Sequence, residues 1–196
     1  MIPRHAQITI VLLLVGACVL GFYVLNEKRK AEEQRRRVAD TRPVTPPVAG
    51  TPERVVLVIA YDDEGVLRRR EATVVLPEDR ALRAREVLRA LLNEYVKKPS
   101  PHPLAEGSDI KDVYLFQGNL AVIDTTAAFA DAHRSGIFVE SLTIVSLVDT
   151  LAANDNGITR VKILVEGKER ETLAGHADLM SFYDVATVHE LAKEMH

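Results

Sequence analysis

The chain has 196 residues, and its 25 Lys and Arg against 28 Asp and Glu give a formal net charge of −3 at pH 7. Residues 1–50 carry 8 basic and 4 acidic side chains, whereas residues 51–196 carry 17 and 24. Such an acidic folded part argues against nucleic acid as its partner, because phosphate binding requires clustered Lys and Arg. A single cysteine excludes a disulfide within the chain.

The first element in chain order is an uncharged apolar run at residues 8–25, from Ile8 to Leu25, which follows a short tail at residues 1–7. As a helix it covers about 27 Å, close to the hydrocarbon thickness of a bilayer, so it predicts an N-terminal transmembrane helix. The letters VGAC in this run also fit a lipoprotein cleavage site, with the lipid on Cys18. The apolar run continues for seven residues beyond Cys18, which favours an uncut anchor over this alternative.

Basic residues follow the anchor, as KRK at 28–30 and RRR at 35–37. The positive-inside rule, taken literally, would keep the C-terminal part in the cytoplasm. Long domains often cross the membrane regardless of such charges, so this cluster alone does not decide the side. Residues 26–53 are predicted to form a charged helix and then a proline-rich linker, because four prolines lie between positions 41 and 52.

The folded part is predicted at residues 54–184, followed by a C-terminal tail at 185–196 as a short helix or a frayed end. It begins with two strands, RVVLVIAY and REATVVL, and continues with a helix that Asp79 caps and Pro99 stops. Apolar positions along this helix have the spacing of one buried face: Ala84, Val87, Leu88, Leu91, Leu92 and Tyr95.

The second half repeats the pattern of two strands and a helix. Gly118 and Asn119 predict a hairpin turn, and the run from 137 to 154 predicts a helix. A last hairpin is expected within 159–173, with Gly167 in its turn. About six strands and two helices in the order ββα-ββα-ββ predict an α+β domain of two layers, with the helices on one face of the sheet.

Candidate chemical side chains gather in the stretch NLAVIDTTAAFADAHRSG, and they are Asp124, Thr125, Asp131 and His133. Such a group could activate a nucleophile or hold a metal. An Asp at a strand end beside Thr more commonly caps a turn by accepting backbone N–H bonds, and we favour this structural role.

His102 is a further candidate, in the loop between the first helix and the next strand. His102 and His176 are isolated in the sequence, so both are expected to be solvated. The segment HELAK places Lys193 where a zinc-protease helix needs a second histidine. We therefore expect no metal site, no cofactor and no catalytic residue.

Several stretches resemble a known family: VVLVIAYDDEGVLRRREATVVL, EVLRALLNEYVKKPSPHPL, NLAVIDTTAAF, and the run from ESLTIVSLV to LAGH. They resemble the GerMN domain, named after the sporulation and germination protein M family of bacteria, over most of residues 54–183. Thr125 stands where the family often has serine. The resemblance implies a membrane-anchored or lipidated domain that faces the cell envelope and acts in protein interaction or as a scaffold, without established catalytic residues.

We therefore expect a non-enzymatic, single-pass protein of the cytoplasmic membrane with an extracytoplasmic domain. Its partners would be the membrane, through the N-terminal helix, and an envelope protein or peptidoglycan, through an exposed sheet edge or the 97–104 loop. One alternative is an envelope enzyme that acts on peptidoglycan or its precursors through Asp124, Asp131 and His133. Another is a regulatory domain facing the cytoplasm, as the basic cluster would permit. The oligomeric state is left open.

Overall fold

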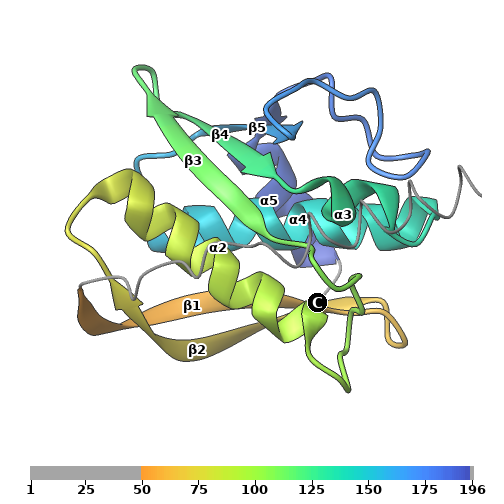
Figure 1. Ribbon diagram of the computed structural model, residues 1–196, viewed down its shortest axis with the longest axis horizontal. Coiled ribbons are helices and arrows are strands. Elements are labelled where there is room, and N and C mark those ends of the chain that lie inside the picture. The colour runs from red at the N-terminus through yellow and green to blue at the C-terminus, as the bar shows by residue number, and fades with distance from the viewer. Residues whose placement is uncertain (1–49, 195–196) are drawn as a thin grey trace, which may run out of the picture. The chain divides into compact units, whose positions relative to one another are not determined.

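A computed structural model describes residues 50–194 of the chain (Figure 1). The predicted tail and anchor, the lipidation alternative at Cys18 and most of the predicted linker lie outside the described residues. The described elements, in chain order, are β1 (Thr51–Tyr61), β2 (Val66–Leu76), α2 (Arg80–Val96), β3 (Ile110–Phe116), β4 (Leu120–Thr125), α3 (Ala127–Asp131), α4 (Ile137–Asn154), β5 (Arg160–Val165), β6 (Tyr183–Asp184) and α5 (Val185–Glu194).

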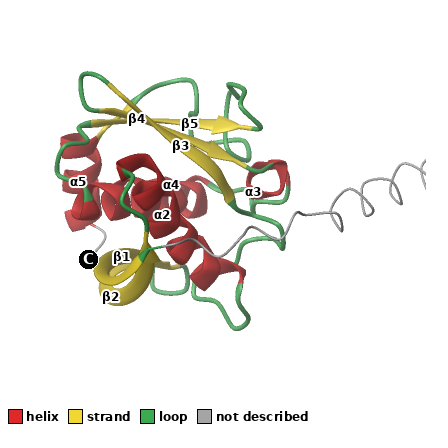
Figure 2. Cartoon of the chain, turned by 60° about the vertical axis from the view of Figure 1, so that its left-hand side comes forward, coloured by secondary structure: helices red, strands yellow, loops and turns green. Residues whose placement is uncertain are grey.

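The domain formed by these elements has three layers. β1 and β2 form a two-stranded antiparallel sheet, and the remaining strands form a second sheet in the order β3-β4-β5-β6. Helices α2 and α4 lie between the two sheets, and α5 packs against α4 (Figures 1 and 2). The predicted α+β class is confirmed, but the prediction of two layers is wrong, because the first strand pair forms its own sheet on the far side of the helices.

The reason for the separate sheet lies in the outer edge of β1, where side chains of α4 take the place of a third strand. Thr150 Oγ1 accepts the N–H of Val58 at 2.8 Å, and Ser146 Oγ donates to the carbonyl oxygen of Val58 at 2.8 Å. Asn154 accepts from the N–H of Val56 at 3.0 Å and donates to its carbonyl oxygen at 2.7 Å. An edge whose polar groups are satisfied in this way has no bonds left for β3.

Helix α2 matches its prediction closely. The Asp79 carboxylate accepts the Leu82 N–H at 2.8 Å as the N-cap, and the buried residues are the six expected apolar positions. The hydroxyl of Tyr95, the last of the six, accepts the N–H of Ala60 at 2.9 Å and thereby bonds a further position on the β1 edge. The core tolerates the buried Tyr95 because its hydroxyl has hydrogen-bond partners.

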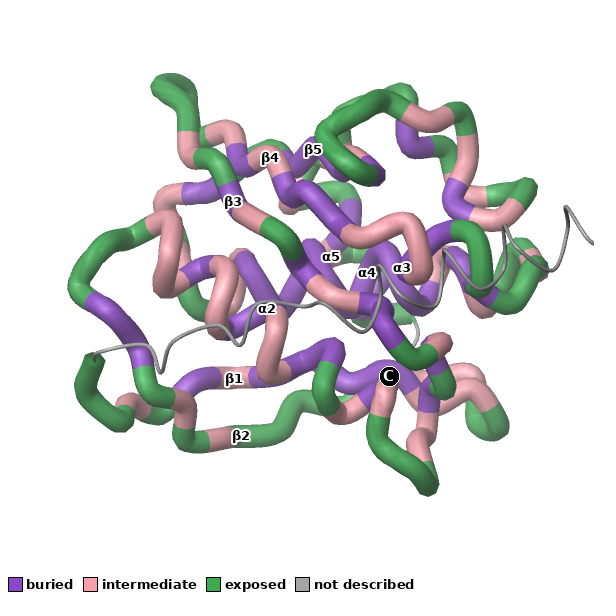
Figure 3. Tube along the Cα trace, viewed as in Figure 1, coloured by how far each residue is buried: buried purple, intermediate pink, exposed green. Residues whose placement is uncertain are grey.

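Helix α4 has the predicted bounds but is buried all round. Every residue from Leu142 to Leu151 is buried, polar ones included, because β1 packs on one side of the helix and the helices α2 and α5 pack beside it (Figure 3). Among the described residues it is the one helix long and apolar enough to cross a membrane, but 61% of it is buried inside the domain. It is therefore the core helix of this domain.

The second sheet confirms one predicted hairpin and corrects another. β3 and β4 join through Gly118 and Asn119, both with positive φ, as a tight turn requires. The hairpin expected within 159–173 is absent from the described chain, since only a single bridge joins Val165 to Lys168. The chain instead returns after a long loop, and the two-residue β6 pairs antiparallel with Arg160 and its neighbour in β5.

Candidate functional site

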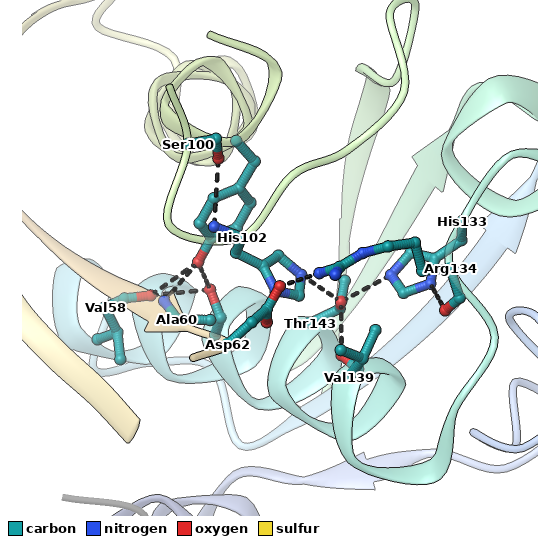
Figure 4. Close-up of polar contacts among 11 residues, drawn as sticks. Val58, Ala60, Asp62, Ser100, His102, His133, Arg134, Val139 and Thr143 are labelled. Carbon is teal, nitrogen blue, oxygen red and sulfur yellow. Dashed lines mark hydrogen bonds and ion pairs between the residues drawn. The ribbon is translucent and has the colours of Figure 1, made fainter. Parts of the chain in front are cut away.

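A buried polar cluster lies at one end of the domain and joins side chains from four segments (Figure 4). His102 Nδ1 lies 2.5 Å from Oδ1 of Asp62, and His102 Nε2 lies 2.7 Å from Oγ1 of Thr143. His133 Nε2 contacts the same Thr143 oxygen at 2.8 Å. Arg134 pairs with the other carboxylate oxygen of Asp62. The cluster thus ties the β1–β2 turn, the α2–β3 loop and the α3–α4 loop to helix α4.

Asp62, His102 and Thr143 are linked in the order of a catalytic triad, in which a carboxylate contacts one nitrogen of a histidine and a hydroxyl contacts the other. With neutral rings, His102 Nδ1 donates to Asp62 and His133 Nδ1 donates to the carbonyl oxygen of Arg134 at 2.7 Å. The Nε2 atoms of both rings are then acceptors that face the single Thr143 hydroxyl proton. Burial lowers the pKa of His102 to about 4, and burial likewise lowers the pKa of His133. Both rings are therefore neutral at pH 7.

The hydroxyl of Thr143 cannot serve as a nucleophile in this conformation. Thr143 is 0% exposed, and two histidines and the carbonyl oxygen of Val139 surround its oxygen within 3.0 Å. A reacting atom needs room about 3 Å from the nucleophile, and these neighbours occupy it. The cluster is therefore arranged to hold loops together, and His102, predicted to be solvated, is 0% exposed because it is the centre of that network.

The candidates near the end of β4 do not meet at one site. Asp124 is buried and its Oδ1 accepts the N–H of Gly167 at 2.6 Å, so it holds the turn after β5. Thr125 donates to a backbone carbonyl of β5 at 2.9 Å. Asp131 is exposed and pairs with Arg170 at 2.5 Å. Of these four candidates, only His133 joins the polar cluster.

Sequence reasoning did not single out Glu140, the most heavily bonded carboxylate of the domain's described part. It is 0% exposed and accepts backbone N–H bonds at 2.8–3.1 Å from Gly136, Ala174, His176 and Ala177. His176 also contacts it through its ring at 2.9 Å, so this histidine is not simply solvated. Burial alone would raise the pKa of Glu140, but these bonds outweigh it and lower the pKa to about 2.

An apolar patch is exposed on the outer face of the second sheet, away from the helices. Register places Tyr114 beside Val122 and Phe116 beside Leu120 on this face. Tyr114 is 46% exposed and Phe116 is 56% exposed. Phe182, 53% exposed, continues the patch, since it lies beside Arg160 and Lys162 of β5, whose cationic groups are 5.7 and 5.6 Å from its ring centroid. We call Tyr114, Phe116, Leu120, Val122 and Phe182 the sheet-face patch.

Metal chemistry finds no support in the described part of the chain, where no group of three or more His, Cys, Asp or Glu side chains could hold an ion. His189 on α5 contacts one carboxylate, with its Nδ1 at 2.8 Å from Asp149. The geometry of residues 50–194 therefore offers two features of interest, a closed polar cluster and an open apolar patch.

Residues 57–171 match the family Germane, described as sporulation and spore germination. A comparison with curated proteins finds no match.

Among solved structures, the tandem GerMN domains of the sporulation protein GerM from Bacillus subtilis align with 67% of this chain at 17% identity and a TM-score of 0.51. The aligned part spans 45% of the length of that tandem structure. The first GerMN domain of the same protein aligns with 66% of this chain and 94% of its own length, at 16% identity and a TM-score of 0.44. At 17% identity, the tandem structure shows a shared fold and nothing further.

Proposed function

Because the chain belongs to the Germane family of sporulation and spore germination domains, we propose that it is a non-enzymatic, membrane-anchored protein of the cell envelope whose GerMN-like domain binds another envelope protein. The proposed anchor is the apolar run at residues 8–25, and the charged segment and proline-rich linker would hold the domain away from the bilayer. The domain would then act by tethering its partner at a fixed distance from the membrane.

The observation that carries the binding role is the sheet-face patch. Tyr114 and Phe116 stand about half-exposed on β3, and Phe182 lies about half-exposed next to the cation Arg160. Protein interfaces are enriched in Tyr, Phe and Arg, which concentrate binding energy in few residues. A protein partner therefore suits this face better than a polar glycan strand, which we treat as the competing outcome of the test.

An enzymatic role has weaker support. The alternative on peptidoglycan required Asp124, Asp131 and His133 to act together, but they bond to Gly167, Arg170 and Thr143 at separate places. The triad-like order at Thr143 has a fully buried hydroxyl. Asp131 is exposed, but it stands apart from Asp124 and His133, so neither arrangement brings an open reactive group together with its partners.

Site-specific photo-cross-linking in the full chain tests the proposal. Phe116→p-benzoylphenylalanine places the cross-linker in the patch, and Phe138→p-benzoylphenylalanine is the matched control, since Phe138 is 50% exposed at the start of α4. We expect a discrete protein adduct in intact cells from position 116 that is absent from position 138 and resists muramidase. An adduct that muramidase degrades would favour a cell-wall polymer, and equal labelling at both positions would refute the role of the patch.

A further inference from the structure

Strand β2 carries a backbone edge that no described residue pairs with. In β1 the N–H groups of Val56, Val58 and Ala60 point away from β2, since each bonds to a side chain of α4 or α2. In an antiparallel pair, two directly opposed residues point their backbone N–H and C=O groups either both toward each other or both away. Glu71 and Arg69 are opposite Val56 and Val58, so their backbone groups point away from β1. The outward positions along the open part of β2 are Arg69, Glu71, Thr73 and Val75.

These four residues are all exposed, and β2 runs along the margin of the domain (Figure 3). Within residues 50–194 their backbone groups have no hydrogen-bond partner. Leu67, at the turn end of the strand, is 0% exposed, so the open edge begins at Arg69. The β1–β2 sheet can therefore grow only on this side, since helix side chains occupy the other.

Four charged side chains lie along this edge: the exposed Glu71, and Arg68, Arg69 and Arg70, which are 54, 48 and 48% exposed. Each arginine uses one terminal nitrogen, and the partners, at 2.6, 3.2 and 2.6 Å, are Glu64, Asp149 and Glu94. Arg80 differs, since it binds Asp155 through two nitrogens. A guanidinium group has five donors, so the three arginines of β2 keep donors for further acceptors.

We propose that the β2 edge is a docking site for an extended acidic segment of another protein, which adds to the sheet as a third strand. The backbone groups of the outward positions would supply the ladder, and carboxylates of the incoming strand would face Arg68 to Arg70. Ala72 to Val75 would take small or β-branched apolar residues at the other end. The same arginines that discourage chance pairing of an open edge select a partner of opposite charge.

This inference goes beyond the proposed function, because β2 and the sheet-face patch belong to different sheets. Its first test is hydrogen exchange resolved at single amides by NMR, on the full chain in detergent micelles. Without a partner, we expect the amides of Arg69, Glu71 and Thr73 to exchange fast and those of Arg70 and Ala72, bonded to β1, to exchange slowly. Slow exchange at the first set that depends on protein concentration would mean that a second copy occupies the edge, and would overturn the proposal.

The second test adds a probe, a synthetic peptide of about eight residues that alternates Thr and Val in its first half and ends in Glu and Asp. It is ordered to run antiparallel to β2, and its control carries Lys at the acidic positions. The acidic peptide should protect the outward amides at Glu71 and Thr73, and the lysine peptide should not. Equal protection by both peptides, or by neither, would overturn the proposal.

Two variants separate backbone pairing from charge. Thr73→Pro removes an outward N–H that β1 does not use, so the fold tolerates it, while binding of the acidic peptide is lost; Thr73→Ala is its control and should bind. Arg69→Glu should lower the affinity for the acidic peptide by about tenfold or more and raise the affinity for the lysine peptide. Should Thr73→Pro fail to fold, the charge reversal still decides, and unchanged affinities there would contradict the proposal.

Discussion

At the residue scale, the buried side chains of Thr143 and Glu140 serve as structural partners for other polar groups, whereas the buried Ser108 Oγ has no hydrogen-bond partner among the described residues. Thr143 serves two histidines and a carbonyl oxygen, while Glu140 serves four backbone N–H groups. A buried polar group costs free energy only when it lacks a partner, so these residues stabilise the fold through each other.

Removing the Thr143 hydroxyl should destabilise the domain without a change in shape. In Thr143→Val the two Nε2 atoms of His102 and His133 lose their shared partner inside the core, at a cost of about 1–3 kcal/mol in the free energy of unfolding. Thr143→Ser keeps the hydroxyl and should lose less. Denaturant unfolding followed by circular dichroism measures both, and equal stability of the valine variant and the wild type would refute the role given to the cluster.

Glu140 should make the domain sensitive to acid. Its pKa of about 2 in the folded state lies below the ordinary value of 4.5, so its contribution is complete above about pH 4.5 and is lost as the pH falls toward 2. Glu140→Gln should lower stability at pH 7 by about 2–4 kcal/mol and should remove part of the slope between pH 4.5 and 2. The free energy of unfolding is measured for variant and wild type across that pH range. Parallel curves for the two proteins would contradict the prediction.

At the scale of the elements, helix α4 is the centre of the domain because it offers a polar face to β1 within an apolar helix. Ser146, Thr150 and Asn154 recur every four residues, so their side chains lie along one stripe of the helix. β1 supplies the matching backbone groups at Val56 and Val58. This pairing fixes the strand against the helix and leaves β2 as the open edge.

Replacing one member of this stripe should release one backbone amide of β1. In Thr150→Val the N–H of Val58 loses its acceptor, and we expect a loss of about 1–3 kcal/mol. Hydrogen exchange should become faster at Val58 in particular, while Ala60, bonded to the Tyr95 hydroxyl, serves as the internal reference. Equal acceleration at both amides would mean global destabilisation and would count against the local account.

The sequence predicts the long helices well because their patterns are local. The Asp79 cap lies three residues from its partner, and the apolar positions of α2 recur every three or four residues. Helix α4 is bounded by Gly136 before it and by Gly157 soon after it. The separate β1–β2 sheet could not be predicted, since it depends on contacts between residues 92 or 98 positions apart, such as Thr150 with Val58. His102 was misjudged for the same reason: its partners, Asp62 and Thr143, are 40 and 41 positions away.

At the scale of the whole molecule, the chain combines a predicted membrane anchor with a folded α+β domain. The anchor at residues 8–25 is a sequence prediction, and residues 50–194 form a closed core with an apolar patch on one sheet and a basic edge on the other. Two surfaces on different sheets would let one tethered domain hold two segments of an envelope assembly. The basic cluster at residues 28–37 favours the opposite orientation under the positive-inside rule, so the side of the membrane is the point where the account can fail.

The proposed envelope function is tested most directly by the membrane topology of the full chain in living cells. Alkaline phosphatase, active only outside the cytoplasm, and a fluorescent protein that matures only in the cytoplasm are fused separately after His196. The account predicts phosphatase activity without fluorescence, which places the domain outside the membrane. Fluorescence without phosphatase activity would place it in the cytoplasm, and the proposed envelope function would then be wrong.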